Sequence, residues 1–178
     1  MNSMRKLLLK SAMNYGLIMG LFWGFKYIFF ILGAFFSFFS FIYWGLTLIV
    51  PFLLLMLLLR FQVFFAHNLS FSRDWTLGIL IFVFAALFVS LEHYVFYRYL
   101  APADYIADSL SSAITLINQS GISEEVKNAI EAMSIPTPIQ MTVQGILNNI
   151  LYGVVVSLPV AMLSSRIKVI GKNTEKLS

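Results

Sequence analysis

The fold is decided by one long and almost uncharged stretch, SAMNYGLIMGLFWGFKYIFFILGAFFSFFSFIYWGLTLIVPFLLLMLLL, residues 11–59. Its only charged side chain is Lys26. A helix needs about 20 apolar residues to cross a hydrocarbon core of about 30 Å, so the stretch is long enough for two spans. A water-soluble domain would cover such helices with a polar face, which this stretch lacks. The chain is therefore predicted to be an integral membrane protein.

Two further apolar stretches bring the prediction to four spans. They are expected at residues 11–36, 39–59, 75–99 and 141–165. Of the 178 residues, 60% are hydrophobic and only 11% are charged, which is far from the average of soluble domains. Because the spans use more than half of the chain, we expect one all-α membrane domain, a four-transmembrane-helix bundle over residues 1–178.

The segments between the spans are predicted to differ in structure. Residues 61–74 are expected to form a loop whose phenylalanines lie at the membrane interface. Residues 100–140 are expected to form a short helical hairpin, because Pro102 is followed by apolar residues at helical spacing. These residues are Ile106, Leu110, Ile114 and Ile117. Gly121 is expected to end the first helix of the hairpin, and Ser123 to cap the second.

The basic residues are unevenly distributed along the chain. They gather in the N-terminal tail, the 60–74 segment and the C-terminal tail, namely Arg5, Lys6, Lys10, Arg60, Arg73, Arg166, Lys168, Lys172 and Lys176. Residues 100–140 contain five acidic residues and a single base, Lys127. Since positively charged segments stay in the cytoplasm, both termini are predicted to be cytoplasmic and residues 100–140 periplasmic.

The first and fourth spans each carry a stripe of small residues at every fourth position. The stripes are Ala12, Gly16, Gly20 and Gly24 in the first span, and Gly145, Asn149, Gly153, Ser157, Ala161 and Ser165 in the fourth. Small residues let two helix backbones approach closely. We favour the interpretation that these two spans pack against each other and close the bundle. The alternative is that one stripe faces a second copy or another membrane protein.

Polar residues from all four spans are predicted to lie at one depth near the outer surface. Lys26 lies 16 residues beyond Lys10, which is about 24 Å along a helix. The same count places Tyr43, Glu92 and Asn149 at about 26 Å from the inner ends of their spans. The predicted polar layer consists of Lys26, Tyr43, Glu92, His93, Asn148 and Asn149.

Two interpretations of this layer stay open. It forms an outward-facing pocket in which Lys26 and Glu92 pair, binding a small anion, a lipid headgroup or a side chain of a partner. Alternatively, Lys26 extends its ammonium separately to the headgroups, and Glu92 is protonated or lies in the interface.

Residues 68–110, NLSFSRDWTLGILIFVFAALFVSLEHYVFYRYLAPADYIADSL, resemble a family of small four-span membrane proteins from Bacteroidetes. That family is catalogued only as a domain of unknown function. Further points of similarity are the YGL sequence at 15–17, Ser70-Phe71, the pair Pro102 and Asp104, a glycine-containing fourth span and a basic tail. The resemblance implies the inner membrane of a Gram-negative cell. It implies no activity and no catalytic residues.

The sequence offers little support for enzymes or for nucleic-acid binding. There is no cysteine, and the HExxH, GxSxG and P-loop motifs are absent. We therefore expect no catalytic residues, no metal and no cofactor. The net charge of +4 forms no basic stripe on a soluble surface, so no nucleic-acid partner is expected. The predicted function is an accessory, scaffold or interaction subunit that binds other membrane proteins or itself in the lipid bilayer. The alternative is a component of a solute- or lipid-handling transporter that uses the polar layer.

Overall fold

The computed structural model describes residues 2–33, 35–65, 70–102, 104–119 and 135–167. Within them the chain forms helices α1 (Asn2–Gly33), α2 (Ser37–Phe65), α3 (Phe71–Val95), α4 (Tyr105–Gln119) and α6 (Pro138–Arg166), and a π-helical segment η1 (Phe96–Leu100) that continues α3. No strand occurs in this part of the chain. Four helical segments are long and apolar enough to cross a membrane: Arg5–Gly33, Ser37–Phe64, Phe71–Leu100 and Pro138–Arg166. The predicted all-α bundle of four spans is confirmed.

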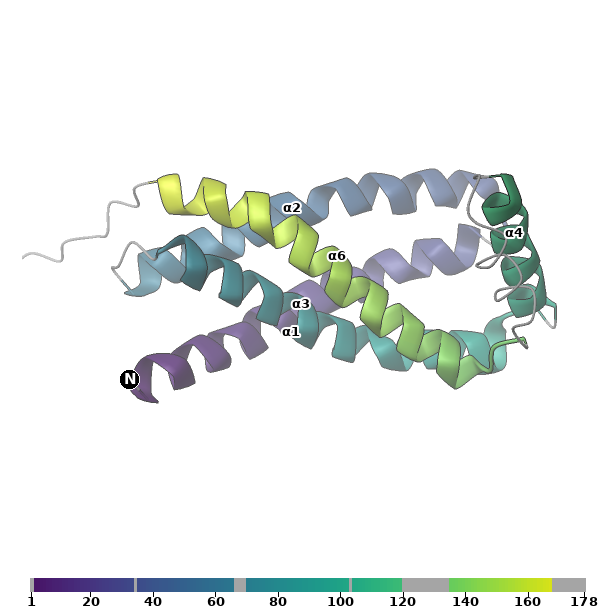
Figure 1. Ribbon diagram of the computed structural model, residues 1–178, viewed down its shortest axis with the longest axis horizontal. Helices are drawn as coiled ribbons and strands as arrows, with labels where there is room; N and C mark the ends of the chain where they lie inside the picture. Colours follow the sequence, from purple (N-terminus) through teal and green to yellow (C-terminus); the bar gives the residue numbers. More distant parts are fainter. Residues whose placement is uncertain (1, 34, 66–69, 103, 120–134, 168–178) are drawn as a thin grey trace, which may run out of the picture. The chain divides into compact units, whose positions relative to one another are not determined.

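The chain divides into two units, and each is described by itself. The first comprises Met1–Ser90 and Gly145–Ser178, and the second comprises Leu91–Gln144. In the first unit α1, α2, α3 and α6 run lengthwise, with the start of α1 and the end of α6 at the same end of the bundle (Figure 1). Its core is built from apolar side chains of all four helices, including Met19, Trp23, Leu54, Leu58, Phe61, Leu77, Ile81, Phe82, Ala85 and Val160.

The second and third helices extend further toward each other than we expected. Because α2 continues to Phe65 and α3 begins at Phe71, the prediction of a loop over 61–74 is wrong at both of its ends. The reason is packing: Phe61 is fully buried, and its ring meets Tyr15 of α1 edge to face with a centroid distance of 6.5 Å. One face at the end of α2, formed by Phe61 and Gln62, therefore belongs to the core.

The fourth span also begins earlier than expected, at Pro138. Thr137 and Gln140 form a reciprocal cap: the Thr137 backbone N–H donates to Gln140 Oε1 at 2.8 Å, and the Gln140 N–H donates to Thr137 Oγ1 at 3.4 Å. The N–H of the first residue of a helix has no partner within the helix, so the missing N–H of Pro138 costs no hydrogen bond there. This capping box fixes the start of α6.

In the second unit, η1 is followed by α4. The Ala101 N–H donates to the Phe96 carbonyl at 2.8 Å, the i to i+5 bond of a π turn. The buried Phe96 ring packs edge to face on Tyr105 with a centroid distance of 5.3 Å. Helix α4 is the predicted first helix of the hairpin. Gly121, Ser123 and the predicted second helix lie outside the described residues.

Candidate functional site

The side chain of Lys26 extends from α1 toward α2, where it contacts one hydroxyl group and lies near two aromatic rings. Its Nζ donates to Thr47 Oγ1 at 3.2 Å, and the Thr47 hydroxyl donates to the Tyr43 carbonyl at 2.9 Å. The same Nζ lies 4.6 Å from the ring centroid of Tyr43 and 5.8 Å from that of Trp23. Aromatic faces attract cations, so both rings stabilise the charge. The structure thus brings together two residues of the predicted polar layer, Lys26 and Tyr43.

The other residues of that layer are distributed over both units. On α6, Asn148 is exposed and Asn149 is half-buried in the first unit. Glu92 and His93, both half-buried, belong to the second unit. The pairing of Lys26 with Glu92 stays a prediction. Its test is charge reversal: Lys26→Glu and Glu92→Lys should each lower the folded yield, and the double swap should restore it.

The small-residue stripes of α1 and α6 face α3. A Cβ atom added to Gly16 would overlap Phe84, and one added to Gly153 would overlap Phe82. Phe82 and Phe84 are two residues apart, and so point to opposite sides of α3, at ~100° per residue. Gly16 and Gly153 therefore pack on α3, where we expected spans one and four to pack on each other.

Gly20 and Ser157 of the stripes also contact α3. A Cβ added to Gly20 would lie 2.9 Å from the ring of Phe88. A Cβ added to Gly78 of α3 would lie 2.8 Å from the Ser157 side chain of α6, so a small residue is also needed on the α3 side. Among the other members, Gly24 and Ala161 are buried and Gly145 is half-buried. Gly16, Gly20, Gly153 and Ser157 are therefore used within the bundle.

A buried polar cluster that the sequence analysis missed joins α2, α3 and α6. It consists of Gln62, Asp74 and Ser164, each no more than 1% exposed. Gln62 Nε2 donates to Asp74 Oδ2 at 2.6 Å and to Ser164 Oγ at 3.0 Å. Two acceptor atoms, Asp74 Oδ1 and Gln62 Oε1, are buried without a hydrogen-bond partner.

A signal for this cluster was present in the sequence. Asp74 is the only acidic residue before Glu92, and the apolar pattern continues past Arg60 through Phe61, Val63 and Phe64. A span extended to these residues would have placed Gln62 inside it. An ionisable group within a membrane helix is costly and by default indicates a functional site.

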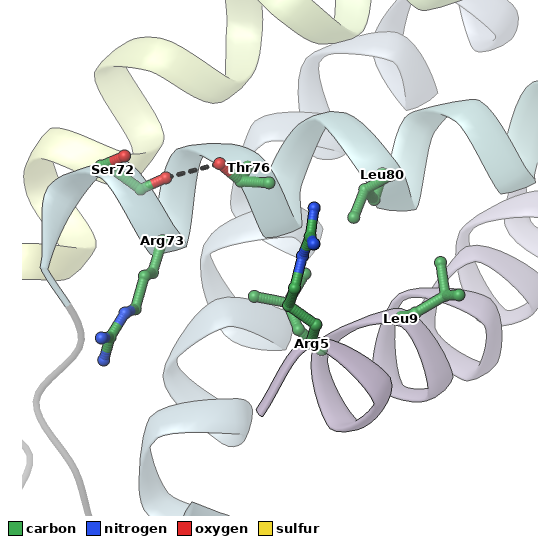
Figure 2. Close-up of a pocket in the computed structure, with 7 residues that line it drawn as sticks. Arg5, Leu9, Ser72, Arg73, Thr76 and Leu80 are labelled. Carbon is green, nitrogen blue, oxygen red and sulfur yellow. Dashed lines mark hydrogen bonds between the residues drawn. The ribbon is translucent and has the colours of Figure 1, made fainter. Parts of the chain in front are cut away.

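A groove of about 710 Å³ lies between the first turns of α1 and α3. Its lining combines two arginines, two hydroxyls and three leucines: Arg5, Leu8, Leu9, Ser72, Arg73, Thr76 and Leu80. Figure 2 shows the Arg5 side chain extending toward α3, whereas Arg73 extends in another direction. The Thr76 hydroxyl donates to the Ser72 carbonyl at 2.8 Å. A basic rim above leucines suits an anionic headgroup with its acyl chain.

Comparison with known proteins gives a family without an assigned activity. The family model described as "Protein of unknown function (DUF4199)" matches residues 14–166. The matched region contains the Lys26 contacts and the buried cluster of Gln62, Asp74 and Ser164. No curated protein and no solved structure matches the chain. The chain belongs to the DUF4199 family of proteins of unknown function.

Proposed function

We propose that this protein is a non-enzymatic accessory or scaffold subunit of the membrane that docks a transmembrane helix of another polypeptide, or of a second copy, on the outer face of α2. The observation that carries the proposal is Gly45. A Cβ atom on Gly45 would meet nothing within 4 Å, in contrast to the packed Gly16, Gly20, Gly78 and Gly153. Glycine weakens a helix by roughly 1 kcal/mol relative to alanine, so an exposed glycine without an internal contact needs another reason.

Large apolar side chains surround this glycine on the same face of α2. Phe41, Gly45, Leu48 and Phe52 fall within about 60° of arc, at ~100° per residue. Phe41 is 75% exposed, and Leu48 and Phe52 are each 73% exposed. Gly45 is thus a notch in an apolar ridge, the shape into which a side chain of a second helix fits. We call Phe41, Gly45, Leu48 and Phe52 the α2 ridge.

The test is site-specific photo-crosslinking in native membranes, with the crosslinker at Leu48. Position 151 is the matched control, because Leu151 is an apolar residue of α6 that is 63% exposed. We expect a discrete protein adduct from position 48, its loss in Gly45→Leu, and only lipid adducts from position 151. Lipid adducts alone from both positions would contradict a docking role for α2. The mass of the adduct separates a second copy from a different partner.

The proposed location is the inner membrane of a Gram-negative bacterium of the Bacteroidetes, with both termini in the cytoplasm and residues 100–140 in the periplasm. Support comes from the basic residues at one end of the spans and the acidic residues after η1. Protease added from the periplasmic side should cleave within 100–140 and spare the C-terminal tail. Cleavage of the tail under these conditions would reverse the orientation.

A second candidate, a lipid-handling transporter component, is favoured by the groove between Arg5 and Arg73. Anionic phospholipid should co-purify with the protein in mild detergent, and its amount should fall severalfold in the double variant Arg5→Gln, Arg73→Gln. Arg166, an exposed arginine at the end of α6, provides the control Arg166→Gln. Equal lipid retention in the double variant and in the control would remove this candidate.

A further inference from the structure

The cluster of Gln62, Asp74 and Ser164 lies where three helix ends meet. Gln62 is in the last turn of α2, which ends at Phe65, and Ser164 is in the last turn of α6, which ends at Arg166. Asp74 is in the first turn of α3. Helix C-termini carry partial negative charge and carbonyl groups without a helical donor. Two of the three contributing helix ends therefore add negative potential to the carboxylate, and the N-terminus of α3 adds positive potential.

The cluster is rich in oxygen atoms, and two of them lack a hydrogen-bond donor. Asp74 contributes two carboxylate oxygens, Gln62 an amide oxygen, and Ser164 a hydroxyl and a carbonyl, which lies 3.5 Å from Gln62 Nε2. Asp74 Oδ1 and Gln62 Oε1 have no donor, although both residues are at most 1% exposed. Buried acceptors are almost always satisfied, so two unsatisfied ones in adjacent side chains indicate a missing positive group.

The protein itself does not supply that group among the described residues. The polar contacts of Asp74 are to Gln62 and Ser164, and not to a lysine or arginine. Asp74 is also the only carboxylate in residues 2–90 and 145–167. A lone carboxylate in an apolar interior is strongly destabilised unless its charge is neutralised. A single positive charge is sufficient to do this.

We propose that Asp74, Gln62 and Ser164 form a binding site for one monovalent cation, a proton or a sodium ion. Oxygen ligands suit a hard cation, whereas divalent ions in proteins are commonly held by more than one carboxylate. In the described part of the chain no group of three or more His, Asp and Glu side chains is close enough to hold a metal ion. If the terminal amide of Gln62 rotates by half a turn, Oε1 takes the place of Nε2 beside the Asp74 carboxyl group. Oε1 then accepts from a protonated Asp74 or ligates the sodium ion.

The experiment measures thermal unfolding of the full-length protein in mild detergent. Sodium chloride is compared with choline chloride at equal ionic strength and constant pH, and the choline series is then repeated from mildly alkaline to mildly acidic pH. The site predicts an upward shift in Tm of about 3 °C or more, either on adding sodium or on acidification. A sodium response identifies the metal ion, and a response to pH alone identifies the proton.

Variants separate this site from other sources of the shift. Asp74→Asn should abolish the response. Ser164→Ala, which removes one oxygen and is more conservative, should reduce it, whereas Ser165→Ala on the neighbouring, half-buried serine should not. The pH series is repeated in His67→Gln, because His67 in the α2–α3 connection titrates in the same range. The nearby charged or titratable groups on the packed helices are Arg5 and Tyr15 on α1, Arg60 on α2, Arg73 on α3 and Arg166 on α6. Asp74→Asn and Ser164→Ala separate a response of the cluster from a response of these groups.

Two results would overturn the proposal. One is a wild-type Tm that changes with neither sodium nor pH. The other is a response that persists unchanged in Ser164→Ala and in Asp74→Asn. That result would place the ion elsewhere. The outcome is independent of the docking role of α2, because the α2 ridge is formed by side chains other than these three.

Discussion

The polar group around Lys26 and the cluster around Asp74 show two different ways in which a membrane helix accommodates a charge. Lys26 has a long side chain, is only half-buried, and meets Thr47, which is 21 residues away in the sequence. Asp74 has a short side chain and is 0% exposed. Gln62 donates both to Asp74 and to Ser164, which is 102 residues away from Gln62 in the sequence. A long side chain reaches a polar region by extending, whereas a short one depends on partners from other helices. The structure around Asp74 should therefore be much less tolerant of substitution.

The largest effect is expected for Gln62→Leu. This variant removes the Gln62 donor of Asp74 and leaves the buried carboxyl group with Ser164 as its remaining polar contact. We expect a loss of about 3 kcal/mol in the free energy of unfolding, measured by denaturant titration in mixed micelles. The double variant Gln62→Leu, Asp74→Leu is the informative control, since it also removes the carboxyl group and so leaves no buried acid that has lost its donor. A double variant that is less stable than Gln62→Leu alone would contradict this account.

A smaller effect is expected for Ser164→Ala, which removes one of the two side-chain partners of Gln62. The expected loss in the free energy of unfolding is about 1 kcal/mol. Its neighbour provides a matched control: the half-buried Ser165 donates to the Met162 carbonyl at 3.1 Å and is not part of the cluster. Ser165→Ala should change the stability by less than about 0.5 kcal/mol. Equal losses for both serines would show that burial of the cluster does not matter.

At the Lys26 site we expect still less. Lys26→Met keeps an apolar chain of similar length and loses the contacts with Thr47 and Tyr43. Because the side chain is half-buried, the free energy of unfolding should fall by less than about 1 kcal/mol. Lys26→Arg should be close to wild type, since a guanidinium also binds to aromatic faces. A loss as large as that of Gln62→Leu would erase the distinction between the two sites.

The smallest effect concerns a titratable group outside the spans. Burial raises the pKa of the Tyr105 hydroxyl above its ordinary value. The folded state then holds this proton more tightly than the unfolded state, so its contribution is present below pH of about 10 and is lost as the pH rises further. Tyr105→Phe should remove a small alkaline loss of stability, seen as the difference between the pH–Tm curves of the two proteins. Identical curves would show that the burial of Tyr105 has no energetic consequence.

How much the sequence could predict differs between these regions. The depth of Lys26 and Tyr43 came from counting residues, and the two residues do meet, because α1 and α2 are joined by a short connection. The cluster of Gln62, Asp74 and Ser164 was missed because a polar residue beside Arg60 and an acid beside Arg73 are typical of a loop. The packing of Phe61 on Tyr15 and the burial of Gln62 show that one face at the end of α2 belongs to the core.

The glycine stripes show the same limit. Their spacing correctly indicated close helix packing, since spacing along one helix determines which residues share a face. The spacing did not identify the helix that fills each groove. We expected spans one and four to fill each other's grooves, but Phe84 and Phe82 of α3 fill them. The same reasoning gave Gly45 no role, because one glycine without a repeat makes no pattern.

The sequence by itself determined that this chain crosses a membrane four times as helices, because hydrophobic length and backbone hydrogen bonding in lipid allow few other structures. The tertiary structure alone decided which helix fills each glycine groove, which glycine stays open, and which three polar side chains are buried together. These contacts join residues far apart in the chain, and their choice depends on side-chain shape at each helix crossing. No periodicity along a single helix encodes that shape.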